Sequence, residues 1–267
     1  MISIAQACFL GAVQGLTEFL PISSSGHLAL VQHFQPGLSA EQKAAVDVAL
    51  HAGTLVAVVA FFARDLWAMG ASLLRPREDR VPRRWVWLLA AATVPAAAVG
   101  LPLHHEIEAA FDSMPLLGVC FLFTGVLLYL GSAVRGALRR ERELALRDAI
   151  TIGAFQALAL LPGVSRSGAT IVGGLFRRVA PDVAARFSFL LSIPAIVGAL
   201  LVEGKTVRTL GPEAYGPVGI GIAVSGVTGF AAIWVLLRLV RQGRLHYFAY
   251  YAWMLGAVVL VGSGLGL

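Results

Sequence analysis

The sequence predicts an all-α polytopic membrane protein with an inverted repeat, built from six transmembrane helices and two re-entrant helical hairpins. Composition is the first observation behind this prediction, because 58% of the 267 residues are hydrophobic and only 13% are charged. A soluble domain usually carries about 25% charged residues, and no water-soluble fold of this size could bury so much apolar side chain. The lipid bilayer must therefore solvate most of the chain.

Six apolar runs are the second observation. Each is long enough to cross about 30 Å of hydrocarbon as a helix. The runs cover residues 43–63, 85–103, 114–134, 183–201, 214–237 and 246–266.

Two further segments are apolar but interrupted. Segment 2–34 is broken by the run from Pro21 to His27, and segment 149–176 by the run from Pro162 to Gly168. In the second segment each arm has about 13 residues, which rise about 20 Å and cannot cross the bilayer. We expect both segments to form hairpins that enter and leave the membrane on one side, with a new helix after Gly168. Their turns must be buried in protein or line a cavity, because the backbone there is not helical.

The two interrupted segments also match each other when the first is shifted by 142 residues. Gln14 then falls on Gln156, and the run Ser23 to Gly26 falls on Ser165 to Gly168. Each repeat would hold one hairpin and three spans, and because three is odd the second copy is inverted. The predicted organisation is a single membrane domain, with repeat one at 1–134, a cytoplasmic linker at 135–147 and repeat two at 148–267.

The basic residues predict the orientation. Of the 21 Lys and Arg residues, 17 lie in loops 64–84, 135–147, 177–186 and 238–245, which this topology places on one side. Three lie on the other side, and Arg166 lies in the second hairpin. The rich side is cytoplasmic by the positive-inside rule, so both termini and the first hairpin should face outward. The same distribution explains a pI near 9.9 without a nucleic-acid partner.

The first interrupted segment carries a candidate site. Two of its polar residues are four apart on one helix face, and a carboxylate inside a membrane is a functional candidate by default. Three serines and a glycine follow, whose N–H groups and hydroxyls can bind an anion. A histidine lies close enough to activate a serine or protonate a leaving oxygen. The alternative is a serine-rich turn that only caps the next helix. The candidate residues are Gln14, Glu18, Ser23, Ser24, Ser25 and His27.

The second interrupted segment carries Arg166, the only basic residue deep within an apolar region. Its guanidinium suits phosphate oxygens, although it could instead be a structural partner for the buried carboxylate of Glu18. Its neighbours supply hydroxyls and a helix N-terminus, which also suit an anion. If the repeats meet, an acid, a hydroxyl, a histidine and an arginine converge, and this set suits phosphoryl transfer. The neighbours are Ser165, Ser167, Gly168 and Thr170.

Two other polar pairs are weaker candidates. Asp47 and His51 are four apart in a span and either line the site or pair with each other. His104, His105, Glu106 and Glu108 fall in a short outer loop, where a solvated loop is favoured over a metal site.

At these motifs the chain resembles the bacterial undecaprenyl diphosphate phosphatase family of the bacitracin-resistance type. That family is marked by Glu/Gln-x-x-x-Glu, a Ser-rich turn ending in Gly-His, and Pro-Gly-x-Ser-Arg-Ser-x-x-Thr. These are Gln14 to Glu18, Ser23 to His27 and Pro162 to Thr170 here, and the resemblance covers essentially the whole chain. Gln14 in the first motif position leaves one carboxylate instead of two, which argues against a two-carboxylate metal site.

The resemblance implies hydrolysis of undecaprenyl diphosphate to undecaprenyl phosphate and inorganic phosphate, which recycles the cell-wall lipid carrier. It also implies a bacterial inner (plasma) membrane protein, bacitracin resistance, and a divalent cation, Mg²⁺ or Ca²⁺, held at Glu18. By position, Ser24 would be the nucleophile, His27 its base or the leaving-group acid, and Arg166 the phosphate clamp. Attack by water instead of Ser24 stays open. The phosphate shell would comprise Gln14, Ser23, Ser25, Ser165, Ser167, Gly168 and Thr170.

One alternative function and one question of helix packing remain open at this point. A transporter or flippase of a phosphate-bearing polyprenyl lipid would share the inverted repeat and both broken helices. Small residues would also allow close helix packing within one subunit or across a homodimer. The small residues are Gly125, Gly131, Gly219 and Gly221.

Overall fold

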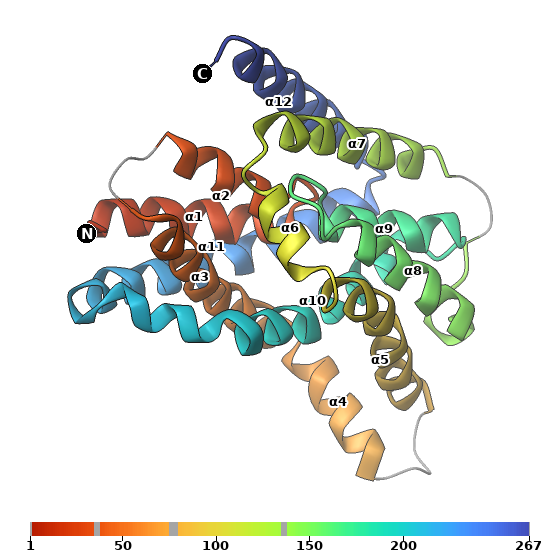
Figure 1. The fold of residues 1–267 in the computed structure, drawn as a ribbon. Helices are drawn as coiled ribbons and strands as arrows, with labels where there is room; N and C mark the ends of the chain where they lie inside the picture. The colour runs from red at the N-terminus through yellow and green to blue at the C-terminus, as the bar shows by residue number, and fades with distance from the viewer. Residues whose placement is uncertain (1, 35–37, 75–79, 135–137, 267) are drawn as a thin grey trace.

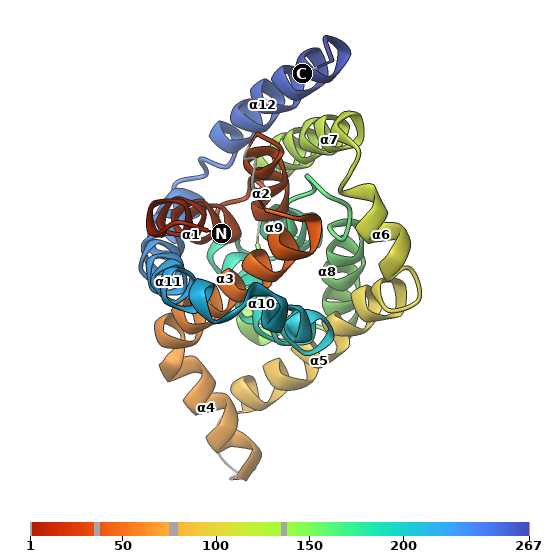
Figure 2. The ribbon, with the colours of Figure 1, turned by 60° about the vertical axis from the view of Figure 1, so that its left-hand side comes forward.

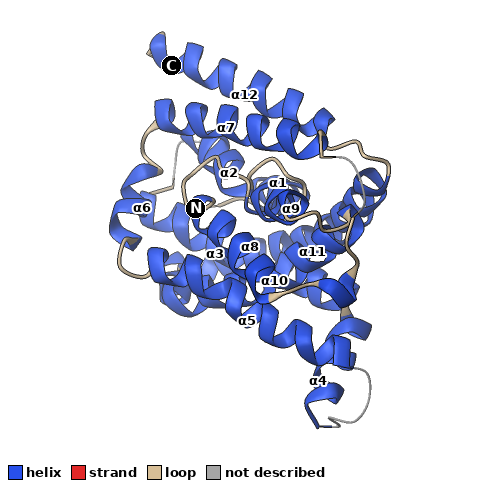
Figure 3. Cartoon of the chain, turned by 90° about the vertical axis from the view of Figure 1, so that its right-hand side faces the viewer, coloured by secondary structure: helices blue, strands red, loops and turns tan. Residues whose placement is uncertain are grey.

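The computed structural model describes residues 2–34, 38–74, 80–134 and 138–266 (Figure 1). This part of the chain holds twelve α-helices and two 3-10 helices, and no strand occurs in it (Figure 3). Residues 75–79 of the expected loop 64–84 and residues 135–137 of the expected linker lie outside the described residues.

The helices follow one another with short connections. In chain order they are α1 (Ile4–Phe19), α2 (Ser24–His33), α3 (Ala40–Phe61), α4 (Ala63–Leu74), α5 (Arg80–Gly100), α6 (His104–Ala110), α7 (Met114–Ser132), α8 (Leu146–Leu158), α9 (Arg166–Phe176), α10 (Pro181–Glu203), α11 (Pro212–Arg241) and α12 (His246–Gly264). The 3-10 helices are η1 (Glu141–Glu143) and η2 (Gly204–Leu210).

The expected transmembrane runs coincide with long apolar helices. Five segments of the described chain are long and apolar enough to span a membrane: α3, α7, α10 with η2, α11 and α12. A sixth passes only when α5 is joined to α6 across a bend of 77°. The expected span 85–103 thus begins inside α5, and the chain turns sharply at its end. An all-α, multi-pass membrane architecture is confirmed.

Both interrupted segments form helix–turn–helix units. Helices α1 and α2 have 16 and 10 residues, and α8 and α9 have 13 and 11. At about 1.5 Å per residue none reaches across 30 Å, and none is among the candidate spans. The start expected after Gly168 is wrong, because α9 begins at Arg166. Ser165 is its N-cap and accepts the Gly168 N–H at 3.1 Å, so the helix starts earlier.

Corresponding helices of the two predicted repeats begin 142 residues apart. This offset relates α1 to α8 and α2 to α9, and the N-caps Ser23 and Ser165 differ by the same number. The packing partners also correspond, since α1 lies along α11 and α5 lies along α8. Helices α7 and α12 lie side by side at one edge of the molecule, as Figures 1 and 2 show. The inverted placement of the second unit in a membrane stays a prediction.

Glycines allow α1 and α11 to approach closely. A Cβ on Gly11 would overlap the carbonyl oxygen of Gly221, and a Cβ on Gly221 would lie 2.8 Å from the Ala7 oxygen. Of the other glycines expected to serve packing, Gly125 lies against Trp253 and Gly131 against Val172. Gly219 has no such contact within the chain, because a Cβ there would meet nothing within 4 Å, and its packing across a homodimer stays a prediction. The one helix therefore has a tightly packed and an open glycine two residues apart.

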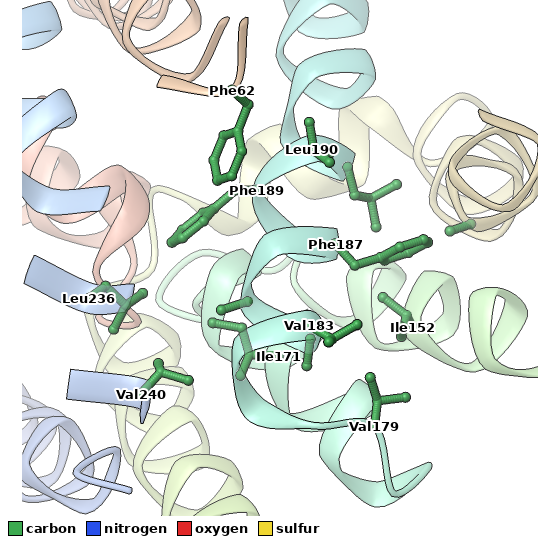
Figure 4. Packing of buried hydrophobic residues seen from close by; sticks show 14 of the residues in the cluster. Phe62, Ile152, Ile171, Val179, Val183, Phe187, Phe189, Leu190, Leu236 and Val240 are labelled. Atoms are coloured by element: carbon green, nitrogen blue, oxygen red, sulfur yellow. The ribbon is translucent and has the colours of Figure 1, made fainter. Parts of the chain in front are cut away.

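The largest apolar cluster surrounds α10 and reaches the end of α1 (Figure 4). Phe189 is fully buried and lies edge-on to Phe19, with ring centroids 5.7 Å apart, and 6.0 Å from Phe62. Because Phe19 directly follows Glu18, this packing fixes the position of the Glu18 backbone, from which the carboxylate extends.

A buried ion cluster ties the predicted linker to the second hairpin. Asp148 is fully buried and accepts bonds from both terminal nitrogens of Arg139, at 2.9 and 2.8 Å, and from Arg177 at 3.0 Å. Burial alone would raise the pKa of Asp148, but the hydrogen bonds from Arg139, Ala145 N–H and Arg177 outweigh it and lower the pKa to about 2. The start of α8 is thereby held against the end of α9.

Candidate active site

The turns of the two hairpins touch each other. A Cβ on Gly26 would lie 3.0 Å from the Cα of Gly163, and the Ser167 hydroxyl donates to the Leu20 carbonyl at 3.2 Å. Thr124 of α7 braces the second turn, since its hydroxyl donates to Gly163 O at 2.9 Å and accepts from Ser165 N at 3.1 Å. The convergence expected if the repeats meet is therefore present. Figure 2 shows α2 and α9 toward the centre of the helices around them.

Glu18 is the centre of the contact. One carboxylate oxygen pairs with the guanidinium of Arg166. The other accepts from the Ser24 hydroxyl at 2.5 Å and from the Gln14 amide at 3.0 Å, and lies 3.6 Å from His51 Nε2. The Glu18 side chain is only 4% exposed, so its charge has been removed from solvent and is matched by these groups. The expected pairing of Gln14 and Glu18 along one helix face is observed.

The first turn holds Ser24 in place by an unusual backbone. Ser23 is the N-cap of α2, accepts the Gly26 N–H at 3.3 Å, and has φ 69° and ψ 100°. A non-glycine residue at positive φ costs about 1–3 kcal/mol and is commonest at functional sites. Ser25 lies beside it, with its hydroxyl oxygen 3.4 Å from that of Ser23. The first residue after this N-cap is Ser24, whose hydroxyl is aimed back at Glu18.

His27 makes its hydrogen bonds away from Ser24. Its Nδ1 lies 2.7 Å from the Ser23 carbonyl oxygen, and its Nε2 lies 2.7 Å from the hydroxyl of Tyr251. A carbonyl only accepts, so Nδ1 donates and the neutral ring accepts the Tyr251 proton at Nε2. Among the described contacts, the Ser24 hydroxyl donates to the Glu18 carboxylate and not to His27. The role of His27 as base or acid stays a prediction.

Tyr251 was not predicted from the sequence. It lies in α12, stacked on His27 with ring centroids 5.7 Å apart and the planes within 7°. A tyrosine in an apolar run belongs to no motif. Tyr251 lies 224 residues from His27 in the sequence, so only the folded structure reveals their contact. Ser188 of α10 is a second such residue, because its hydroxyl lies 2.6 Å from that of Thr170.

Thr170 and the second-turn serines occupy different parts of the site. Thr170 is fully buried, and its hydroxyl also bonds the Arg166 carbonyl at 2.7 Å. As placed it braces α9 against α10. Ser165 and Ser167 have hydroxyl oxygens 3.3 Å apart, which repeats the Ser23–Ser25 arrangement of the first turn. The Gly168 N–H is occupied by Ser165.

Arg166 occupies a position that helix electrostatics disfavours. It is the first residue of α9, where the helix dipole is positive and cations are normally avoided. Its side chain is 17% exposed, so part of it stays accessible while the guanidinium pairs with Glu18. An arginine at the positive end of a helix dipole, which is paired with a carboxylate and still partly accessible, is suited to an anionic ligand. The structural role that the sequence left open is also realised, since Glu18 is its partner.

The oxygen donors around Glu18 fit a hard divalent cation. The Oε1 atom of Gln14 is buried without a hydrogen-bond partner, while the Nε2 atom of the same amide donates to the Glu18 carboxylate at 3.0 Å. The described residues contain no group of three or more His, Cys, Asp or Glu side chains that could hold a metal ion. Mg²⁺ usually keeps waters and takes one or two carboxylates with substrate phosphates, so such a cage is not needed.

The weaker candidates have clear positions. His51 lines the site at Glu18, while the Asp47 carboxylate accepts from Gln32 at 2.6 Å. Asp47 and His51 meet through the Asp47 backbone oxygen, 2.7 Å from His51 Nδ1. His105 lies in the short exposed helix α6, 3.8 Å from Glu108, with 81% of its side chain exposed. The loop expected there is a helix, and the choice between a solvated segment and a metal site stays a prediction.

The chain is similar to known proteins along almost its whole length. The profile of the family described as Bacitracin resistance protein BacA matches residues 7–258. A protein of Syntrophotalea carbinolica named Undecaprenyl-diphosphatase is 42% identical over 96% of this chain and 97% of its own. Proteins of the same name from Rubrobacter xylanophilus and Methanobrevibacter smithii are 44% and 38% identical, each over 97% of this chain and 98% of their own.

Proposed function

The chain belongs to the bacitracin resistance protein BacA family, and we infer that it hydrolyses undecaprenyl diphosphate to undecaprenyl phosphate and inorganic phosphate. It is a multi-pass membrane protein whose substrate is a lipid. The observation that carries the assignment of the site is the single carboxylate of Glu18, which contacts both the Ser24 hydroxyl and the Arg166 guanidinium. A base, a nucleophile and a phosphate clamp thus share one buried point.

In the proposed mechanism Arg166 binds oxygens of the terminal phosphate. Glu18 then accepts the Ser24 proton as Ser24 Oγ attacks the terminal phosphorus. The bond between that phosphorus and the bridging oxygen breaks, and undecaprenyl phosphate leaves with the electron pair. Glu18 passes this first proton to the departing undecaprenyl phosphate. It then takes a proton from water as the water oxygen attacks the phosphoserine. The bond between phosphorus and Ser24 Oγ breaks, Glu18 returns the proton to Oγ, and inorganic phosphate is released. The two turns would surround the phosphate, and they carry the hydroxyls of Ser23, Ser25, Ser165 and Ser167.

A divalent cation, Mg²⁺ or Ca²⁺, is part of this proposal. Gln14 Oε1 and Glu18 would hold it, and it would neutralise charge on the phosphate oxygens. The orphaned amide oxygen supports the fit, because an unsatisfied buried acceptor costs about 1–3 kcal/mol unless a donor or cation meets it.

His27 and Tyr251 need to supply little acid in this scheme. The leaving group is a phosphate monoester with a second pKa near 6, so it departs readily without full protonation. We propose that Tyr251 fixes the His27 ring, and that the Nδ1–H to Ser23 bond steadies the turn that presents Ser24.

The test is release of inorganic phosphate from undecaprenyl diphosphate by detergent-purified protein with Mg²⁺. Ser24→Ala should lower kcat by about 10²–10⁴-fold, the usual range for losing such a group. Ser263→Ala is the matched control, since its hydroxyl bonds only the Leu260 carbonyl in α12. A folded Ser24→Ala protein with wild-type turnover would remove Ser24 as nucleophile. No release by the folded wild type would contradict the enzyme and leave lipid transport.

The proposed orientation places both termini and the site opening on the periplasmic or outer face. It is supported by the basic loops at 238–245 and 177–186, whose side would be cytoplasmic. Impermeant labelling of a single cysteine placed at Gln242 in spheroplasts should fail, and labelling at Lys205 should succeed. The reverse pattern would invert the topology. A homodimer stays a prediction for cross-linking.

A further inference from the structure

We propose that Thr124 is a positioning residue for Arg166: its hydroxyl holds the second turn against α7 at two backbone atoms, and so sets where the guanidinium meets the substrate phosphate. The proposal rests on the function proposed above and deepens it. Thr124 lies in α7, outside both hairpins, and belongs to none of the three motifs.

The Thr124 hydroxyl both donates to the second turn and accepts from it. It donates to the Gly163 carbonyl at 2.9 Å and accepts from the Ser165 N–H at 3.1 Å. These two backbone atoms lie on either side of Val164, so the hydroxyl binds the turn at two points. Thr124 is only 2% exposed, and a hydrogen bond is stronger where water is excluded.

Other threonines in the long helices use their hydroxyls locally. Thr17, Thr93 and Thr228 each donate to the carbonyl four residues earlier in the same helix, at 2.7, 2.9 and 2.8 Å. This local bond is a common arrangement for a threonine inside a helix. Thr124 instead donates to a residue 39 positions later in the chain. Its hydroxyl therefore serves the second turn and not its own helix.

The second turn lies directly on one face of α7. Gly163 has φ 89°, and a Cβ there would lie 2.8 Å from the Leu117 carbonyl oxygen and 3.0 Å from the Cβ of Cys120. Leu117, Cys120 and Thr124 are separated by three and then four residues, so they share one helix face. The glycine lets the turn approach α7, and the Thr124 hydroxyl sets its position there.

The position of Arg166 follows from this anchor. Ser165 is the N-cap of α9 and Arg166 is the first residue of the helix, so the anchored N–H lies one residue before Arg166. In the proposed mechanism Arg166 turns from Glu18 to the phosphate, which weakens the pairing that also holds the turn. The two bonds to Thr124 are not part of that exchange. A misplacement of about 1 Å in a binding group can cost about 100-fold in rate, so this anchor matters for turnover.

The experiment compares Thr124→Val, which replaces the hydroxyl by a methyl group of similar size, with Thr124→Ser, which keeps the hydroxyl. Thermal unfolding in detergent first establishes that the variants fold. Thr124→Val should lower kcat/KM for phosphate release about 10–100-fold, and Thr124→Ser should restore most of it. Thr93→Val is the matched control and should leave kcat/KM unchanged, because it removes a bond within α5.

Wild-type kcat/KM in folded Thr124→Val would overturn the proposal, as would equal losses in the Val and Ser variants. If Thr124→Val does not fold, Thr124→Ala replaces it in the same comparison, because the smaller side chain makes no steric demand on the turn.

A double-mutant cycle gives a readout that a general loss of stability would not produce. If Thr124 places Arg166 on Glu18, Arg166→Ala should lower the midpoint of thermal unfolding less in the Thr124→Val protein than in the wild type. Equal lowering in both proteins would show that Thr124 does not act through Arg166, and would overturn the proposal. The cycle needs no turnover. Failure of the proposed function would appear separately, as no phosphate release by the folded wild type.

Discussion

Glu18, one residue before the end of α1, pairs with Arg166, the first residue of α9, across 148 positions of sequence. The carboxylate is 4% exposed and the guanidinium 17% exposed. The pair joins the two hairpins at the point where their turns meet. Position and burial are therefore coupled in one contact.

Arg166→Ala should destabilise the protein by about 3–5 kcal/mol, because it leaves a buried carboxylate without its cation. Adding Glu18→Gln should recover part of that loss, since the uncompensated charge disappears. Neither the single nor the double variant should release phosphate from the substrate. Thermal unfolding in detergent measures the first effect, and phosphate release measures the second. If Arg166→Ala and the double variant unfold at the same temperature, the pair is not energetically coupled.

Tyr251→Phe should lower phosphate release by about 3–10-fold, because His27 Nε2 loses a hydrogen-bond donor worth about 1 kcal/mol. The ring remains stacked, so the fold should be unaffected. Tyr250→Phe is the control, because the neighbouring Tyr250 is 52% exposed. Equal activity of the two variants would show that the hydroxyl of Tyr251 does not orient His27.

Gly11→Ala should destabilise the helix pair α1 and α11 by about 1–3 kcal/mol, since its methyl group would overlap the Gly221 carbonyl. Gly219→Ala makes the matched comparison, because nothing lies within 4 Å of its Cβ position. There we expect no loss and a gain of up to about 1 kcal/mol, because alanine is the better helix former. The midpoint of thermal unfolding in detergent distinguishes them. Equal shifts would contradict the close approach of α1 and α11.

Asp148→Asn should destabilise the protein in a pH-dependent manner. The pKa of Asp148 is lowered to about 2, so its pairing stabilises the fold fully above the ordinary value of 3.8 and is lost as pH falls toward 2. The pH-dependent part should amount to about 2 kcal/mol, and the variant should approach wild type in acid. Unfolding measured at pH 7 and near pH 2.5, beside the exposed Asp112→Asn, checks this. If the difference in stability between wild type and Asp148→Asn were the same at both pH values, Asp148 would not be the source of the pH dependence.

Features that depend on local sequence could be predicted. Helix type and length follow from apolar runs, so the spans and the short arms of both hairpins were correctly anticipated. The contact between Gln14 and Glu18 follows from a four-residue spacing on one helix. The early start of α9 was missed, because the Ser165 side chain caps the helix before Gly168.

The sequence by itself determined the membrane class, the two broken helices and the candidate site residues, since hydrophobic length and helical period act over a few residues. Only the tertiary structure decided which distant groups meet: Arg166 on Glu18, Tyr251 on His27, and His51 behind the carboxylate. The physical reason is that these contacts arise from the packing of whole helices. Such packing depends on glycine contacts such as Gly11 with Gly221, which no local pattern distinguishes from the open Gly219.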